Sequence, residues 1–303
     1  AAARAREVAA AAAADARAPP CATVRGALSV LCADPRNRVV VTSRASCAEL
    51  QAAFGTIPGC SLCADNGQWL WWAGGRERGG DDADDAARGG MRWEESEAAR
   101  QQNQGASEWR ELALSLARLY AERTNGAVVH SSQSGVVFDF AAADPEFGAM
   151  QARELSAHMS DMLRDVPRVE ISLSECELLV HPRGVDKGGL LRQLLTTQGV
   201  SGARPDLLLL LGDDASDEPA FAALEAWRAE LPLSAHSPPP AVYGVTVGQS
   251  HSRAPWYLDE QAAVPPLLEA LKWGSLRASK SLSMHAGMHA LHAAAIAATA
   301  LSD

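Results

Sequence analysis

Five consecutive leucines at residues 207–211 limit most strongly what this chain can fold into. The run is too short for a typical helix and lacks the polar alternation of a half-exposed strand. It therefore predicts a strand buried on both faces, as in a parallel sheet covered by helices. The run continues into GDDASDE, residues 212–218, which contains four carboxylates. Since ligands of open α/β sheets bind just beyond the carboxyl ends of strands, this acidic turn is the first candidate site.

On both sides of a middle section, short apolar segments typical of strands alternate with segments of helical periodicity. The middle section has a residue pattern typical of antiparallel hairpins. The fold class predicted is therefore α/β, a doubly wound core split by an inserted smaller α/β domain. In the helix expected at residues 108–122, Trp109, Leu112, Leu116 and Leu119 share the predicted apolar face. The other expected helices are residues 22–31, 47–54, 146–163, 187–195, 219–229 and 264–271, and the strands 38–41, 61–64, 207–211 and 241–247, with paired strands within 127–140 and 169–180.

Four segments follow from this reading: residues 1–67 and 182–273 form the two parts of the core, 68–181 the inserted domain and 274–303 a flexible tail. Residues 73–107 interleave glycines with aspartates and predict a flexible insertion. In the tail, three histidines recur at helical spacing and could coordinate a divalent metal. Without a neighbouring carboxylate, a solvated helix or disorder is the favoured interpretation. They are His285, His289 and His292.

Charge and hydropathy exclude several classes of function. The formal net charge is −10, and Lys and Arg form no run longer than two, so neither nucleic acid nor a membrane surface is an expected partner. No stretch approaches 18 strongly apolar residues, and Glu7 and Asp15 interrupt the Ala-rich start where a signal peptide would be apolar. The protein is expected to be soluble and cytoplasmic.

Six cysteines, mostly beside small or apolar neighbours, are typical of reduced thiols in a cytosolic protein. Cys60 and Cys63 form a C-x-x-C pair around a short apolar stretch. A zinc ribbon would need a second pair, and a redox dithiol usually opens a helix, so metal or redox roles are the less favoured interpretation.

Crowded carboxylates repel one another unless a cation neutralises them, and hard oxygen ligands suit Mg2+. Asp213, Asp214 and Asp217 are accordingly candidate metal ligands; the alternative is an acidic helix N-cap with surface charge. Lys187, in GVDKGG at a predicted helix start, could hold a phosphate against the metal, although lysines at helix starts are commonplace.

Six ordered blocks between about residues 20 and 271 resemble the trehalose-6-phosphate phosphatase family of the haloacid-dehalogenase-like superfamily. They are LCADPRNRVVVTSR, ERTNG, ADPEFGAMQARELSAHM, GVDKGG, GDDASDE and TVGQSHSRAPWYLDE. The resemblance implies a Rossmann-like core with an inserted α/β cap, a Mg2+ site, and hydrolysis of trehalose 6-phosphate through an aspartyl-phosphate. It is strongest to the phosphatase domain fused behind a trehalose-phosphate synthase, so a synthase domain is an implied partner.

By this resemblance Asp213 holds Mg2+, with Asp214 and Asp217 alongside it. Lys187 steadies the phosphate and Ser43 hydrogen-bonds the phosphoryl group, although the loop at Ser43 is one glycine shorter than the usual Ser-Gly-Arg.

Substrate binding on the cap side is implied at His181 and Arg183, where a structural role for His181 is the alternative. Leu179 replaces a sugar-binding glutamate of the family, and Asp65, Asn66 and Gly67 stand where Glu-His-Gly is usual.

The gravest departure lies near residues 5–9, where the family carries Asp-x-Asp: first the nucleophile, then the general acid and base. Ala5 occupies the nucleophile's place, and Glu7 is the sole carboxylate of this window. Three hypotheses stay open. The domain is a phosphatase with weak or no catalysis; it is active with a nucleophile strand outside this chain; or it is a non-catalytic regulatory or scaffolding module of a synthase.

Overall fold

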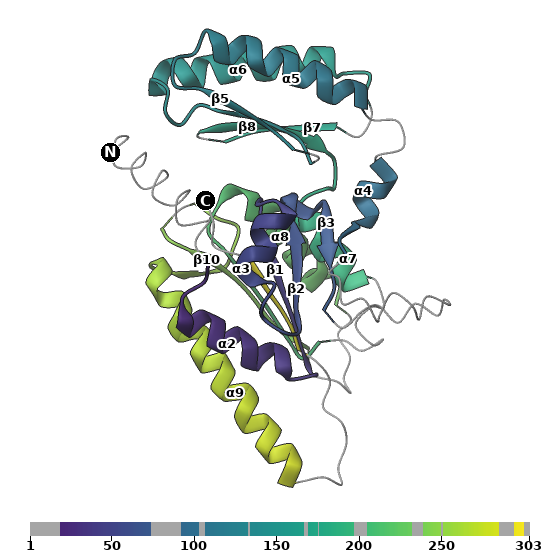
Figure 1. The fold of residues 1–303 in the computed structure, drawn as a ribbon, viewed down its shortest axis with the longest axis vertical. Coiled ribbons are helices and arrows are strands. Elements are labelled where there is room, and N and C mark those ends of the chain that lie inside the picture. Colours follow the sequence, from purple (N-terminus) through teal and green to yellow (C-terminus); the bar gives the residue numbers. More distant parts are fainter. Residues whose placement is uncertain are drawn as a thin grey trace.

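The computed structural model contains two sheets, one in a core and one in a cap stacked above it (Figure 1). The core combines residues from both ends of the chain, and the cap lies between them in sequence. The residues described by the structure are 19–73, 92–102, 107–132, 134–166, 169–174, 176–196, 205–231, 239–249, 251–284 and 294–299.

The core sheet has eight strands. All neighbouring strands from β11 to β2 run parallel, whereas the last two pairs are antiparallel. In spatial order the strands are β11 (Trp256–Leu258), β10 (Ala241–Val247), β9 (Leu207–Gly212), β12 (Ala294–Thr299), β1 (Asn37–Thr42), β2 (Cys60–Ala64), β3 (Trp69–Trp71) and β4 (Glu94–Glu95).

The leucine run forms β9 and is buried on both faces, as predicted. Leu208 and Leu210 pack against α8 (Glu218–Ala229) and α7 (Lys187–Thr196). Leu209 and Leu211 pack on the opposite face. That face is covered by α2 (Ala22–Ala33) and α9 (Val264–Met284), with α3 (Cys47–Phe54) packed further along the sheet. Apolar side chains on both faces explain why no polar residue interrupts the run.

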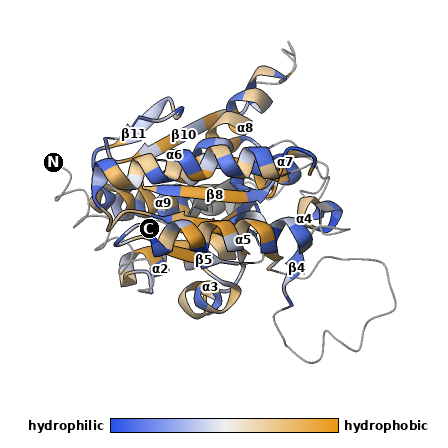
Figure 2. Cartoon of the chain, turned by 90° about the horizontal axis from the view of Figure 1, so that it is seen from above, coloured by the Kyte–Doolittle hydropathy of each residue, from blue (hydrophilic) through white to orange (hydrophobic). Residues whose placement is uncertain are grey.

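The cap is an antiparallel sheet in the order β5 (Val128–Ser131), β6 (Val136–Asp139), β8 (Glu177–Pro182) and β7 (Val169–Leu173). Helices α5 (Ser107–Glu122) and α6 (Pro145–Met162) cover one face, and the other face is turned toward the core (Figure 1). In Figure 2, α6 mixes hydrophilic and hydrophobic residues while β8 beneath it is mostly hydrophobic. Tyr120, Phe138 and Leu155 are among the side chains of the separate apolar cluster formed by this unit.

The buried face of α5 agrees with the predicted one at Trp109 and Leu116 and differs at Leu112 and Leu119. Leu112 is 36 % exposed and Leu119 54 % exposed, whereas Trp109, Ala113 and Tyr120 are buried. Alanines at the interface let the helix approach the sheet closely, and Tyr120 is buried where Leu119 was expected.

The expected inserted domain begins too early in the sequence. β3 pairs with β2 and β4 pairs with β3, so residues 69–71 and 94–95 extend the core sheet instead of joining the cap. Trp69 and Trp71 pack against the core cluster around Leu62. Within the predicted flexible insertion, β4 and α4 (Glu97–Gln102) are regular elements; residues 74–91 and 103–106 lie outside the described residues.

The expectation of a flexible tail is corrected for residues 274–284 and 294–299. Helix α9 continues to Met284, and residues 294–299 form β12, parallel to both β1 and β9. Ser275 anchors the helix, since its Oγ donates to Asp34 Oδ2 (2.5 Å) and its carbonyl accepts from Arg36 Nη2 (3.2 Å). The three tail histidines lie outside the described residues.

Two further expectations concern cysteines and membranes. Cys60 and Cys63 are both buried within β2 as free thiols. Within the part of the chain that the structure describes, every helix is too short or too polar to cross a bilayer.

Candidate functional site

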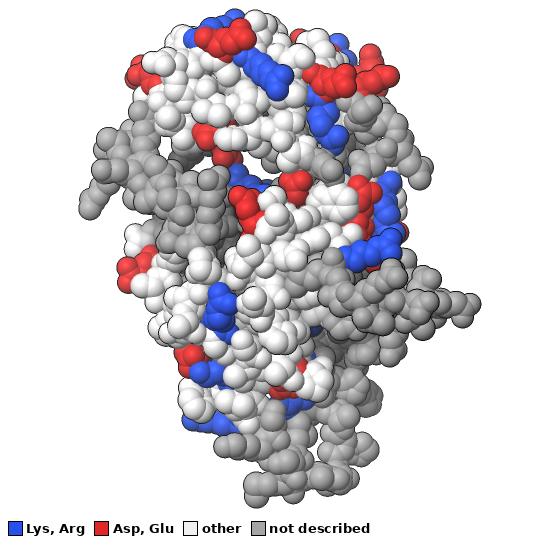
Figure 3. All heavy atoms as spheres, in the orientation of Figure 1, with Lys and Arg blue, Asp and Glu red and all other residues white. Residues whose placement is uncertain are grey.

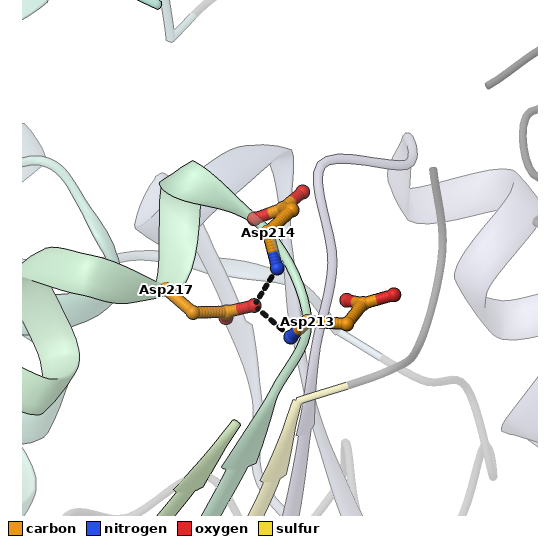
Figure 4. Close-up of side chains that lie close together, drawn as sticks. All are labelled: Asp213, Asp214 and Asp217. Carbon is orange, nitrogen blue, oxygen red and sulfur yellow. Dashed lines mark hydrogen bonds between the residues drawn. The ribbon is translucent and has the colours of Figure 1, made fainter. Parts of the chain in front are cut away.

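The acidic turn after β9 is ordered by its own carboxylates. Asp217 Oδ2 accepts hydrogen bonds from the backbone N–H groups of Asp213 (2.9 Å) and Asp214 (3.2 Å) (Figure 4). Asp214 Oδ1 in turn accepts from the backbone N–H of Ser216 (2.7 Å) and from its hydroxyl (2.6 Å). These bonds close the short 3-10 helix η3 (Ala215–Asp217) and hold the three aspartates together where the strand ends.

Gly212 makes room for this arrangement. A Cβ atom at this position would lie 2.4 Å from Cγ of Asp217. Any side chain would therefore displace the carboxylate that organises the turn.

Lys187 reaches the same turn from the first residue of α7. Its ammonium lies 2.9 Å from Asp217 Oδ1 and 3.9 Å from Asp214 Oδ1, and its side chain is only 4 % exposed. Gly188 permits this approach, because a Cβ there would lie 2.4 Å from the carbonyl oxygen of Pro219 at the start of α8. The structure thus brings together the lysine and the acids that were singled out in the sequence.

Burial and mutual repulsion give the acids unequal pKa values. Burial, reinforced by the charges of Asp214 and Asp217, raises the pKa of Asp213 to about 7. Burial also opposes ionisation of Asp214, but Lys187, Arg44 and the bonds from Ser216 outweigh it and lower the pKa of that carboxyl. Burial and the charge of Asp214 also raise the pKa of Asp217, although Lys187 opposes that shift.

A divalent cation fits this donor set. One oxygen from each aspartate can lie within 4.8 Å of the other two. Both oxygens of Asp217 already accept bonds from Lys187 and from backbone N–H groups. Asp214 Oδ2 accepts a longer bond, from Arg44 (3.3 Å), and burial and the neighbouring charges raise the pKa of Asp213, so these two side chains are better placed to hold the ion. Carboxylate oxygens are ligands that Mg2+ prefers.

The loop after β1 borders the acids. Ser43 is buried, and its Oγ accepts from the backbone N–H of Ala45 (3.0 Å). The next residue, Arg44, lies 3.3 Å from Asp214 Oδ2 and 2.6 Å from Glu177 Oε2 at the start of β8. Neither Arg44 nor Glu177 was predicted from the sequence as a site residue. The signal for Arg44 was present, since it follows the end of a parallel strand at the same edge of the sheet as the acids.

His181 and Arg183 lie where β8 leaves the cap. His181 is buried, and its Nδ1 is 3.2 Å from the carbonyl oxygen of Pro182. Arg183 is mostly exposed and its Nε lies 3.8 Å from Glu170. Their positions are on the cap side of the connection to α7, whereas Lys187 and the aspartates belong to the core.

A second loop of the core lies beside Ser43 and forms hydrogen bonds with the cap. Asp65 and Asn66 both adopt left-handed backbone conformations in η1 (Asp65–Gly67), with φ of 52° and 53°. The N–H of Asn66 donates to the carbonyl of Ser43 (3.0 Å), and Asp65 Oδ1 accepts from the hydroxyl of Ser134 in the cap (2.6 Å). On the face shown in Figure 3, acidic and basic side chains border the hollow between core and cap.

Comparison with known proteins gives consistent matches. A family model described as Trehalose-phosphatase matches residues 9–262. The chain is 31 % identical over 244 residues to alpha,alpha-trehalose-phosphate synthase 5 (UDP-forming) of Arabidopsis thaliana, covering 80 % of this chain and 26 % of that protein. The chain thus spans about a quarter of the length of the curated relatives it matches.

Two solved structures share the fold. Aspergillus fumigatus trehalose-6-phosphate phosphatase superposes with a TM-score of 0.57 at 28 % identity, over 84 % of this chain and 85 % of that one. The C-terminal domain of Candida albicans trehalose-6-phosphate phosphatase gives a TM-score of 0.68 at 24 % identity, with the same coverage of both chains. The Rossmann-like core with an inserted α/β cap, expected from the sequence, is confirmed.

Proposed function

Because this chain belongs to the trehalose-phosphatase family, we propose that the cluster around Lys187 binds Mg2+ and the phosphate ester of trehalose 6-phosphate. One observation carries the proposal: a lysine that is only 4 % exposed contacts Asp217 and lies 3.9 Å from Asp214, in the same turn as Asp213, whose pKa is raised to about 7. An acidic N-cap or a lysine at a helix start needs no such burial. Strongly perturbed, buried charges at a strand end are typical of functional sites.

Each side chain then has a distinct role. Lys187 has three N–H donors, and its 2.9 Å bond to Asp217 leaves donors for phosphate oxygens. Asp217 orients Lys187 and the turn, and Asp213 and Asp214 hold the divalent ion. A bound Mg2+ supplies Lewis-acid stabilisation of charge on the phosphoryl oxygens. The Ser43 hydroxyl donates to one of those oxygens.

On the cap side, we propose that His181 and Arg183 contact the sugar of the substrate. Both lie where β8 leaves the cap, on the side that leads into α7 and Lys187. Arg183 also lies 3.8 Å from Glu170. His181 contacts the carbonyl oxygen of Pro182, so a structural role is the alternative for His181.

Hydrolysis by this chain is proposed to be weak or absent. The window at residues 5–9 lacks the Asp-x-Asp pair that supplies nucleophile and general acid, and it lies outside the described residues. The strand between β9 and β1 in the sheet is β12, residues 294–299. Its sequence, AAIAAT, contains no carboxylate. Removing the attacking group forfeits most of the acceleration of a slow phosphate-ester reaction.

A second candidate function is regulatory or scaffolding support of a trehalose-phosphate synthase, with the domain acting as a pseudoenzyme. The curated relatives are named as such synthases, and the chain covers about a quarter of their length. In this case the partner is a synthase domain, and bound trehalose 6-phosphate reports the level of its product. A cytoplasmic location agrees with the free cysteines.

The test measures phosphate release and ligand binding on the same protein. With Mg2+, wild type is expected to release phosphate from trehalose 6-phosphate at a rate no more than about a thousandth of that of a phosphatase with its nucleophile. Calorimetry is expected to detect trehalose 6-phosphate but not trehalose, and Lys187→Met to abolish that heat. Asp161→Asn, an exposed acid paired with Arg164 on the cap, is the control.

The outcomes separate the candidates. Rapid turnover that Asp213→Asn abolishes would overturn the proposed impairment and retain the site. An absence of both heat and phosphate release would exclude the ligand and leave the scaffolding function.

A further inference from the structure

Arg44 connects the core and cap through two acids. Its Nη1 lies 2.6 Å from Glu177 Oε2, at the start of cap strand β8. Its Nη2 lies 3.3 Å from Asp214 Oδ2, in the acidic turn of the core. The guanidinium is 27 % exposed, so solvent screens these pairs less than it screens pairs on the outer surface. The planar fork of arginine is suited to bridging two carboxylates in this way.

The same guanidinium balances the charge of the acidic turn. Lys187 and Arg44 provide two positive charges against the three of Asp213, Asp214 and Asp217 if all are ionised. Burial disfavours the charge of Arg44, but Asp214 and Glu177 outweigh it, so the pKa of the guanidinium is raised. Arg44 thus neutralises part of the negative charge at Asp214, as a divalent cation bound there would do.

We propose that Arg44 is a positioning residue that competes with the divalent ion for Asp214 while holding the cap through Glu177. The proposal rests on the proposed function, because it requires an ion at the three aspartates. An ion bound at Asp214 repels the guanidinium and weakens its pair with that carboxylate. Occupancy of the ion site and the Arg44 bridge are therefore antagonistic, and by linkage each weakens the other to the same degree.

A second contact between core and cap provides an internal comparison. Ser134 in the cap donates from its hydroxyl to Asp65 Oδ1 (2.6 Å) and from its backbone N–H to Asp65 Oδ2 (3.3 Å). Asp65 is not one of the three clustered aspartates. The ion is expected to loosen the bridge at Arg44 and to leave the one at Asp65 in place.

The test compares Mg2+ affinities by calorimetry. Arg44→Gln is expected to bind Mg2+ about five-fold more tightly than wild type, because a competing charge is removed. Arg44→Lys should restore an affinity near that of wild type. Glu177→Gln should bind Mg2+ several-fold more weakly, since Arg44 then loses its charged partner in the cap and pairs more strongly with Asp214. Arg123→Gln removes the same charge from an exposed cap pair with Glu154 and should change nothing.

Hydrogen exchange adds a readout without metal. Amides of residues 176–180 should exchange several-fold faster in metal-free Arg44→Gln than in wild type, and Mg2+ should produce the same change in wild type. A wild type that binds Mg2+, with Arg44→Gln binding no more tightly, would overturn the competition and leave the proposed function. No binding by wild type would overturn both, and unchanged exchange in Arg44→Gln would refute the bridge.

Discussion

At the scale of single residues, Gly212 determines whether the acidic turn can form. The position where its Cβ would lie is 2.4 Å from the carboxylate carbon of Asp217. That carboxylate accepts bonds from Lys187 and from two backbone N–H groups. The missing side chain is thus a requirement of the site as well as of the strand end.

Gly212→Ala should lower the free energy of unfolding by about 2 kcal/mol, because the carboxylate must move away from its buried partners. Urea unfolding measures this loss, and Mg2+ binding should weaken in parallel. Gly26→Ala is the matched control: a Cβ there has nothing within 4 Å, so alanine in this helix should be neutral or stabilise by up to about 1 kcal/mol. Equal stabilities of the two variants would contradict this account of the turn.

The sequence could predict that Lys187 meets the acids because both signals are local. A buried strand ends at Gly212, a helix begins at Lys187, and the end of a parallel strand lies beside the starts of such helices. The Arg44 bridge could not be predicted in this way. Its partner Glu177 belongs to the cap, and how the cap sits on the core depends on tertiary contacts that strand and helix patterns do not encode.

At the scale of elements, a polar clamp fixes α9 to the connection between α2 and β1. Asp34 Oδ1 accepts from Arg36 Nε (2.8 Å), and its Oδ2 accepts from the hydroxyl of Ser275 (2.5 Å). Asn37 Nδ2 also donates to Ser275 Oγ (3.1 Å). Hydrogen bonds from Arg36 are the main reason that the pKa of Asp34 lies well below its usual range. The clamp explains why the helix continues past the predicted end.

Asp34→Asn should destabilise the protein by about 1–2 kcal/mol at pH 7, and this cost should shrink below about pH 4. The lowered pKa gives the sign: the carboxylate stabilises the fold above its unfolded pKa near 3.8, and this contribution is lost as pH falls toward the folded value. Urea unfolding at pH 7 and pH 3 measures both. Asp161→Asn, in an exposed pair with Arg164, should cost little at either pH. A pH-independent cost of Asp34→Asn would exclude the ion pair as its cause.

Most long elements could be predicted because their periodicity and caps are local. The helix at Cys47–Phe54 was predicted with its observed bounds, and Ser46 and Glu49 form a capping box at its start. The strand Trp69–Trp71 was missed because three residues carry too little pattern, and only pairing with β2 makes them a strand. The predicted face of α5 was wrong at Leu112 and Leu119 for a similar reason, since the sheet below the helix decides which side is buried.

At the scale of the whole molecule, the core sheet is completed in its middle by a strand that comes late in the sequence. β12 pairs with β1 through Val39 opposite Ile296, and with β9 through Leu209 opposite the same residue. Without β12, the inner edges of β1 and β9 would each present unpaired backbone groups. The two halves of the core therefore depend on this segment to form one sheet.

Ile296→Pro should lower the free energy of unfolding by about 2 kcal/mol, because proline removes an N–H from a strand paired on both sides. Thermal unfolding followed by circular dichroism measures the loss. Ile296→Val keeps the N–H and is expected to cost less than about 1.5 kcal/mol. If proline at this position were as well tolerated as valine, β12 would not contribute to the stability of the sheet.

Helix α4, which precedes the cap in sequence, and helix α7, which follows it, lie close together, since Glu97 and Gln101 of α4 line the same pocket as Gly189 and Gln193 of α7. A domain that is attached along one side can rotate about that side. Glu177 is five residues along β8 from Pro182, about 16 Å from that attachment. The ion pair between Arg44 and Glu177 acts at this distance from the axis of rotation. The same attractive force therefore opposes rotation of the cap more strongly there than it would beside the attachment.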